Sequence, residues 1–228
     1  MRALGPRLAG VAAVAAALTV VTSPAGAFAA EPAAKKVLTP TQLAVASRGA
    51  FVKATSVRVR AKITIASLKL TAAVDVHVSH TACVGVVNYG TLGVAQLRQV
   101  GGKGYVTGTG NVWLAITNND PAAVPGTWKV VDSTNKVVGP LFDLCSWTKE
   151  VNAAFPSGYS WVALPAKTID GTKTRAVRPA GVLGVADYVA ASGTPYIVMQ
   201  TVKGGWVRFQ EWNKPVSVVA PADNQLIP

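Results

Sequence analysis

Residues 56–78, SVRVRAKITIASLKLTAAVDVHV, contain the pattern that decides the fold. Apolar residues take every odd position from Val57 to Ile65 and every even position from Leu68 to Val78. A period of two is typical of a half-buried strand, and the change of parity indicates a turn between two strands. The stretch therefore predicts a β-hairpin with one apolar and one polar face.

Pairing of Ile65 with Leu68 would place Ala61 opposite Ala72 and Arg58 opposite Asp75. Because the intervening Ala-Ser is unfavourable for a two-residue hairpin turn, a longer loop with a shifted pairing of the strands is an alternative. The two alanines form a dent in the apolar face, which either a helix side chain fills or a ligand occupies. Close packing of protein interiors favours a filled dent.

The N-terminal residues 1–29 have the features of a secretory signal peptide. Two early arginines precede a short apolar run at 8–21, and small-residue cleavage patterns follow at 25–29. The run is too short to span a membrane. Since no cysteine follows it before Cys83, we expect no lipid anchor. The mature chain is expected to be secreted, and either released or held at the cell envelope by non-covalent contacts.

The rest of the chain is long enough for one domain with a sizeable core. We predict a flexible lead at 30–38, a single domain at 39–221 and a tail at 222–228. The full chain carries 22 Lys+Arg and 10 Asp+Glu, a net charge of +12. Removal of the two signal-peptide arginines leaves 20 − 10 = +10, which favours an anionic neighbour such as wall polymer or a membrane surface. No run of five basic residues occurs, which argues against nucleic-acid binding.

Two helices are expected beside the sheet. Thr39, Pro40 and Gln42 form a capping box that predicts a helix to about Lys53. Its apolar face would place Leu43, Ala46 and Ala50, with Phe51 beside them, against the hairpin. Apolar residues at three- and four-residue spacing predict a second helix over 140–155. Trp147 lies off its main apolar stripe, which makes Trp147 a candidate for a rim or partner contact.

Further stretches have strand character and are separated by turn residues. They are 84–89, 94–100, 105–107, 111–117, 127–131, 159–164, 172–177, 186–190, 196–203, 206–212 and 216–220. With the hairpin and two or so helices, they predict an α+β domain built on a curved antiparallel sheet. Trp113, Trp128, Trp161 and Trp206 lie among apolar neighbours and are expected in the core.

Cys83 and Cys145 are the two cysteines of the chain, and an oxidising compartment favours a disulfide between them. Closing a loop of that length stabilises the fold by on the order of 4 kcal/mol. Together with His77 and His80, the same residues have the composition of a tetrahedral zinc site. However, a spacing of three on a strand alternates faces, so we predict the disulfide and no metal or cofactor.

No catalytic pattern is evident. The chain lacks a Gly-x-Ser-x-Gly nucleophile motif, and its ten carboxylates form no readable pair. The segment 101–104, Gly-Gly-Lys-Gly, lacks the spacing of a phosphate-binding loop and lies between two predicted strands. We therefore predict that the protein is not an enzyme.

The order of several short motifs resembles that of the half-barrel lipid carriers of bacterial envelopes, the LppX/LprG-type lipoproteins and their LolA-like relatives. The matching pieces are a helix before Ser-Val-Arg-Val, then 99–106, Trp113, 126–128, a helix near 141–154, 169–171, 187–190, 193–196 and 209–216. The resemblance implies a sheet curled over helices, with an apolar cavity that binds acylated lipids. Two features depart from the family: the lipidated cysteine is missing, and the Cys83/Cys145 pair is not expected of it generally.

Two hypotheses for the function follow. The first is a secreted non-enzymatic protein that binds a lipid or other apolar molecule between the sheet and the helices. Its candidate lining residues are Val59, Ala61, Ile63, Leu70, Ala72 and Val74 from the hairpin, with Leu43, Ala46 and Ala50 from the first helix. The second is a secreted wall-associated or protein-interaction domain of the same fold with a filled core and no small-molecule ligand.

Overall fold

The structure is a computed structural model. It describes residues 37–65, 70–120, 124, 126–131, 142–143, 145–155 and 158–227. The predicted signal peptide and most of the predicted flexible lead lie outside these residues. One compact unit begins at Leu38 and continues to the C-terminus.

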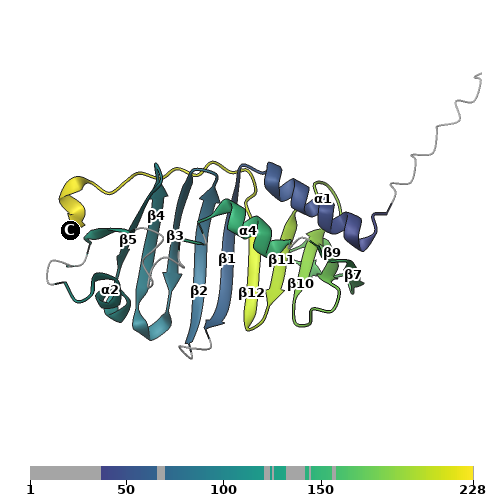
Figure 1. Ribbon diagram of the computed structural model, residues 1–228, viewed down its shortest axis with the longest axis horizontal. Coiled ribbons are helices and arrows are strands. Elements are labelled where there is room, and N and C mark those ends of the chain that lie inside the picture. The colour runs from purple at the N-terminus through teal and green to yellow at the C-terminus, as the bar shows by residue number, and fades with distance from the viewer. Residues whose placement is uncertain are drawn as a thin grey trace, which may run out of the picture. The chain divides into compact units, whose positions relative to one another are not determined.

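A single large sheet dominates this unit (Figure 1). Its strands are β1 (Ser56–Ile65), β2 (Leu70–Ser79), β3 (Ala82–Asn88), β4 (Val94–Val100), β5 (Lys103–Gly108), β6 (Trp128–Val131), β7 (Trp161–Leu164), β8 (Thr168–Ile169), β9 (Thr172–Pro179), β10 (Ala186–Ala190), β11 (Ile197–Val202), β12 (Gly205–Gln210) and β13 (Leu226–Ile227). Among the described residues the strand order is β13-β6-β5-β4-β3-β2-β1-β12-β11-β10-β9-β7, and β8 pairs with β9 beside this path. The predicted curved antiparallel sheet is confirmed, with the exception of the β13–β6 pair, which is parallel.

The predicted hairpin forms β1 and β2, which lie in the middle of the sheet. Its register is shifted by two residues from the pairing expected for a two-residue turn: Ile65 lies opposite Leu70, Ile63 opposite Ala72 and Ala61 opposite Val74. A shift of two preserves parity, so every side chain stays on its predicted face. Arg58 still reaches Asp75, now diagonally, with Nε to Oδ1 at 2.7 Å. The connecting residues 66–69 lie outside the described part of the chain.

Helix α1 (Pro40–Lys53) has the predicted start and end. The backbone N–H of Gln42 donates to the Thr39 hydroxyl at 3.2 Å, and the backbone N–H of Thr39 donates to Gln42 Oε1 at 3.0 Å, which completes the capping box. The predicted buried face is only partly correct. Leu43, Ala44, Ser47 and Phe51 are buried, whereas Ala46 and Ala50 are half-buried beside this stripe.

Three predicted elements are wrong in type or length. Residues 111–117, expected as a strand, form part of helix α2 (Gly110–Thr117), because Trp113 and Ile116 are buried at helical spacing. The second predicted helix, 140–155, is interrupted: residues 142–143 are helical and residues 145–146 are not. Helix α4 (Trp147–Ala154) begins after Ser146, whose hydroxyl accepts from the Lys149 N–H at 3.4 Å. Residues 216–220 form no strand.

The C-terminal residues assigned by sequence to a tail add to the sheet. A short 3₁₀ helix, η3 (Asp223–Gln225), precedes β13, which pairs with β6. Another 3₁₀ helix, η2 (Gly90–Leu92), connects β3 and β4. None of the helices in the described ranges has both the length and the apolar character needed to cross a membrane.

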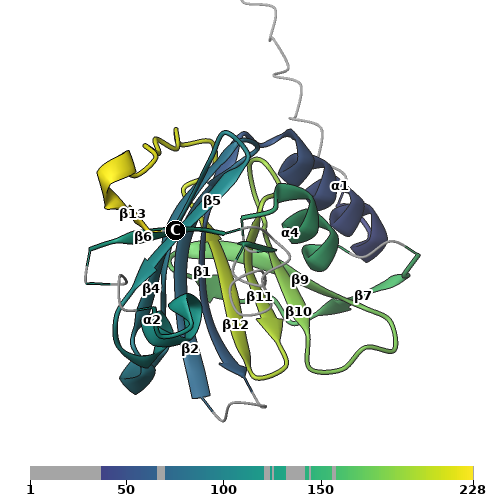
Figure 2. The same ribbon diagram turned by 60° about the vertical axis from the view of Figure 1, so that its left-hand side comes forward.

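Helices α1 and α4 lie on the same face of the sheet (Figures 1 and 2). We call this the inner face, and the opposite one the outer face. The main core cluster lies between the inner face and these helices and includes Phe51, Val59, Leu97 and Ile197. A second, smaller cluster around Tyr188 lies on the outer face of β9 and β10.

Candidate ligand-binding site

The strand register shows which residues lie on the inner face, because directly opposite residues of antiparallel strands share a face. A set of such opposite residues across neighbouring strands is called a row. One row runs from β9 to β2 through Val177, Asp187, Gln200, Val207, Ala61 and Val74. The next row toward the β1–β2 loop contains Val202, Gly205, Ile63 and Ala72. The row on the other side contains Phe209, Val59 and Val76.

Large aromatic side chains fill the half of the inner face near the start of β1. The Phe51 ring of α1 packs edge-on against Trp147 of α4, with centroids 5.2 Å apart, and against Trp212 at 5.0 Å. It also contacts Phe209 of β12 at 5.6 Å. These four residues are called the aromatic cluster below. The prediction that Trp147 forms a rim is therefore wrong, since this side chain is only 9% exposed.

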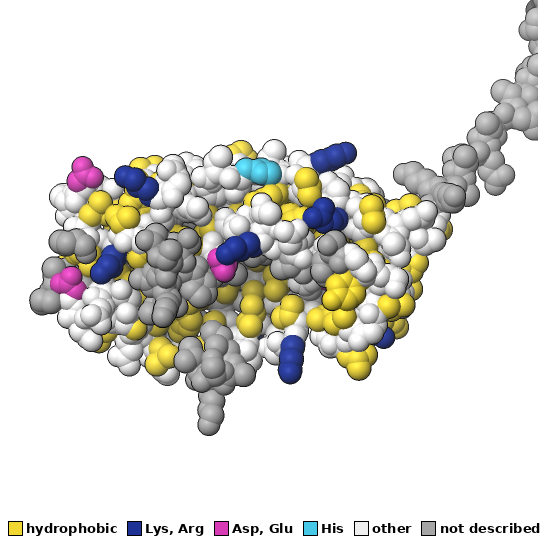
Figure 3. All heavy atoms as spheres, viewed as in Figure 1, with side chains coloured by type: hydrophobic (Ala, Val, Ile, Leu, Met, Phe, Trp, Pro, Cys, Tyr) yellow, Lys and Arg dark blue, Asp and Glu magenta, His cyan; other side chains and the backbone are white. Residues whose placement is uncertain are grey.

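Small residues line the other half of the same face, near the end of β1. Ala61, Ala72 and Gly205 form its floor, and Ile63, Leu70 and Val207 beside them are only half-buried. These six residues are called the small-residue patch below. Figure 3 shows hydrophobic side chains on this side of the molecule below the position of α4 in Figure 1.

Gly205 has a structural reason to be small. A Cβ placed there would lie 1.9 Å from the Lys62 carbonyl oxygen, so a side chain is incompatible with this approach of β12 to β1. The floor of the small-residue patch is thus constrained by the backbone as well as by its two alanines.

The structure brings most of the sequence-predicted lining residues together. The six hairpin residues lie on the inner face of β1 and β2, as their parity predicted. Leu43 of α1 belongs to the same core cluster, but Ala46 and Ala50 do not. Whether these residues contact a ligand stays a prediction.

A polar pair on the inner face, the buried Asp187 and the half-buried Gln200, was not predicted from the sequence. Asp187 is 2% exposed, and its Oδ1 accepts a hydrogen bond from Gln200 Nε2 at 2.8 Å. Burial raises the pKa of Asp187 to about 7, although the Gln200 hydrogen bond opposes this shift. The signal was an aspartate at the second position of the otherwise apolar strand 186–190, but the face on which it lies depends on a register that the sequence does not specify.

The predicted disulfide between Cys83 and Cys145 is confirmed, with Cα atoms 5.5 Å apart. It joins β3 to the residue two positions before α4, next to the aromatic cluster. His80 Nε2 lies 2.9 Å from the Ala54 carbonyl oxygen, and its ring contacts Trp147. Within the described residues, no group of three or more His, Cys, Asp or Glu side chains could hold a metal ion.

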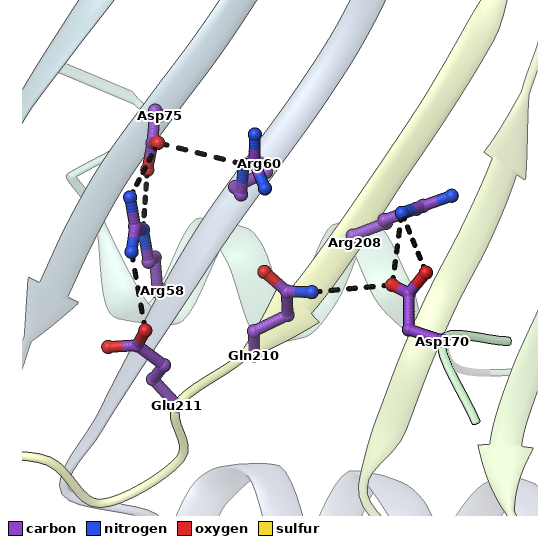
Figure 4. A network of polar contacts seen from close by, with 7 residues as sticks. All are labelled: Arg58, Arg60, Asp75, Asp170, Arg208, Gln210 and Glu211. Carbon is purple, nitrogen blue, oxygen red and sulfur yellow. Dashed lines mark hydrogen bonds and ion pairs between the residues drawn. The ribbon is translucent and has the colours of Figure 1, made fainter. Parts of the chain in front are cut away.

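The outer face of the central strands is polar and carries an ion-pair network (Figure 4). Arg58 binds Asp75 through two nitrogens at 2.7 Å and Glu211 through a third contact at 3.2 Å. Arg208 of β12 binds Asp170 at 3.0 Å. The pKa of His77, on the same face, is lowered by burial.

A cavity of about 380 Å³ lies away from the predicted residues, at the turn between β4 and β5. Its lining includes Gln99, Lys103, Val131 and Phe142. Gly104 is part of the wall, and a Cβ there would lie 2.8 Å from the Phe142 ring.

The architecture is that of a large curved sheet that carries helices on its inner face, and solved structures share it. LprF from Mycobacterium bovis matches with a TM-score of 0.56 and 16% identity, over 80% of this chain and 97% of that one. The lipoprotein LppX from Mycobacterium tuberculosis matches with a TM-score of 0.48 and 19% identity, over 78% of this chain and 98% of that one. No protein-family model matches the sequence, and no curated protein does.

The predicted resemblance to LppX/LprG-type proteins is thereby confirmed at the level of the fold. At this identity the match defines the fold and not the ligand. The disulfide is consistent with an oxidising compartment outside the cytoplasm.

Proposed function

We propose that this protein is a non-enzymatic carrier that binds a lipid or other apolar molecule against the inner face of its sheet. The observation that carries the proposal is the small-residue patch. Its alanines and glycine carry little side-chain volume, although the alanines are only 4% exposed, and its half-buried Ile63, Leu70 and Val207 offer apolar surface to a ligand. Burying an alkyl chain there would contribute about 0.8 kcal/mol per CH₂.

Native mass spectrometry of the mature protein, purified from its own host's culture medium, tests this proposal. A bound mass that disappears on organic extraction would support the carrier and identify the ligand class. A bare polypeptide mass from the host, together with no uptake of added lipid, would overturn it.

A matched pair of variants tests the location. Ala72→Phe would fill the small-residue patch, whereas Ala73→Phe makes the same change at the next, exposed position on the outer face. We expect Ala72→Phe to lose the bound lipid with little change in the unfolding midpoint, and Ala73→Phe to retain it. If the inner face is already filled, Ala72→Phe should instead destabilise the fold by about 1–3 kcal/mol through overpacking.

A second candidate function, binding of an anionic wall polymer, is favoured by the outer face of β1. Arg58, Arg60 and Lys62 occupy alternate positions there and project from the same side of the strand. Retention on purified cell wall should weaken as salt screens the charges. Arg60→Gln with Lys62→Gln should reduce retention, whereas Lys53→Gln on α1 should not. Retention that is insensitive to salt would exclude this candidate.

A further inference from the structure

Asp187 and Gln200 form a pair of polar side chains on the apolar inner face. They lie side by side on β10 and β11, in the same row as Val207 and Ala61. Their neighbour on the other side is the fully buried Val177 of β9. Because the main core cluster includes Val177 and Ala61, this pair lies on the inner side and not in the outer cluster around Tyr188.

The pair retains hydrogen-bonding capacity after its mutual contact. Gln200 donates to one carboxyl oxygen, Oδ1. Among the described residues, no hydrogen-bond donor contacts the second oxygen, Oδ2. Because Oδ2 has no partner among these residues and is not one of their buried atoms that lack a partner, it keeps access to solvent. A ligand that covers this oxygen must supply a hydrogen bond, since its desolvation is otherwise not repaid. A ligand that supplies the missing hydrogen bond would therefore gain affinity at this point.

The surroundings favour an uncharged ligand group. Val177 and Val207 flank the pair in its own row, and Val189 lies in the next row opposite Arg175. The Nη2 group of Arg175 donates to the Leu38 carbonyl oxygen. With its pKa raised to about 7 by burial, Asp187 is partly protonated near neutral pH and can donate to an oxygen as well as accept from a hydroxyl. A ligand carboxylate or phosphate would lose its hydration here beside the Asp187 carboxyl, while the nearby cation, Arg175, is already bound to the Leu38 carbonyl oxygen.

The pair is also within reach of a molecule bound at the small-residue patch. Asp187 is in β10 and Ala61 in β1, three strands apart, which corresponds to about 14 Å across the sheet. Gln200 is adjacent to Val207, which belongs to the patch. An alkyl chain lying across the strands on the patch would thus place a polar end group at the pair.

We propose that Asp187 and Gln200 form a polar subsite that binds an uncharged oxygen of the ligand, such as an alcohol hydroxyl or an ester carbonyl, at one end of the small-residue patch. The inference rests on the proposed carrier function and specifies the chemistry of its ligand: an alkyl chain that ends in, or is interrupted by, a neutral oxygen group.

Four probes of equal chain length test the subsite: dodecane, dodecanol, methyl dodecanoate and dodecanoate. Each displaces a neutral fluorescent probe, N-phenylnaphthylamine, from the mature protein. The alcohol and the ester should bind about tenfold more tightly than the alkane, because a tenfold difference in affinity corresponds to about one net hydrogen bond. They should also bind more tightly than the carboxylate.

Asp187→Leu should lower the affinity for the alcohol and for the ester to that for the alkane, and it should leave the affinity for the alkane unchanged. Asp187→Asn, which keeps a hydrogen-bonding group, should retain the preference. Gln200→Leu should weaken it, whereas the matched Met199→Leu, at the neighbouring position on the outer face, should not. Alkane displacement by each variant confirms that it is folded.

The outcomes separate the two proposals. If none of the probes displaces the fluorophore, the carrier function fails and the subsite with it. If the alkane binds but the alcohol and ester show no preference, or Asp187→Leu preserves the preference, the carrier stands and the subsite is wrong. Tighter binding of dodecanoate than of dodecanol would also overturn the subsite.

Discussion

The two halves of the inner face are built from the same strands and the same apolar alternation, yet they differ in the size of their side chains. Near the start of β1, Phe51 fills the space beneath α1 and α4, and the facing valines are fully buried. Near the end of β1, Ala61, Ala72 and Gly205 replace large residues. The alternating pattern therefore fixes which face is apolar, while residue size sets where that face is closed by packing.

The two halves also differ in how they are held. Two helices, the Cys83–Cys145 disulfide and the aromatic cluster converge on the first half. The small-residue patch is supported mainly by the ladder of β12, β1 and β2. This difference fits the proposed carrier function, because a ligand at the small-residue patch would not need to displace the aromatic cluster.

Phe51→Ala should produce the largest change in stability. The side chain is fully buried and contacts three aromatic rings, so its removal leaves a large cavity. We expect the free energy of unfolding to fall by about 4 kcal/mol in chemical denaturation. Val52→Ala, a neighbour that is 48% exposed, should change it by less than about 0.5 kcal/mol. Equal effects of the two substitutions would refute the central role of the aromatic cluster.

Asp187 should make stability fall as pH rises. Its folded-state pKa of about 7 exceeds its ordinary value of 3.8, so between these values the folded protein binds more protons than the unfolded chain. Linkage then predicts that the free energy of unfolding falls by about 3 kcal/mol between pH 4 and pH 7.

His77 has the opposite effect on stability. Burial lowers its pKa, so its contribution to the free energy of unfolding is lost as pH falls below about 6.5.

The contribution of Asp187 is isolated by comparison with Asp187→Asn. The difference in unfolding free energy between wild type and variant should shift in favour of Asn by about 3 kcal/mol across this pH range. A pH-independent difference would mean that the carboxyl is not desolvated in the folded state.

Gly205→Ala should have a smaller effect, confined to the small-residue patch. Its Cβ would meet the Lys62 carbonyl oxygen at 1.9 Å, which forces β12 away from β1. We expect a loss of about 2 kcal/mol in the free energy of unfolding. Lys203→Ala, at an exposed position in the preceding turn, provides the control and should be neutral. A neutral Gly205→Ala would show that the strands can separate here at little cost.

Local signals in the sequence were sufficient for several elements. The capping box at Thr39 located α1, and the period of two located the hairpin, because both depend on neighbouring residues only. The two cysteines identified the disulfide without any knowledge of the fold, since no other pairing within the chain exists.

Other features depended on contacts that the sequence does not reveal. Residues 111–117 have strand character, but the packing of Trp113 and Ile116 at helical spacing selects a helix. Trp147 lies off the apolar stripe of its helix and is nonetheless buried, because Phe51 and His80 reach it from other elements. In both cases tertiary packing overrides local propensity.

The sequence by itself determined which residues of the hairpin face the interior, because a strand has a side-chain period of two and parity survives a register shift of two. It could not determine that Ala61 lies opposite Val207, or that Asp187 shares their row, since both depend on the pairing of β1 with β12, two strands that are distant in the chain. Only the tertiary structure sets that register. It places the small residues on one half of the inner face and the buried carboxyl beside them.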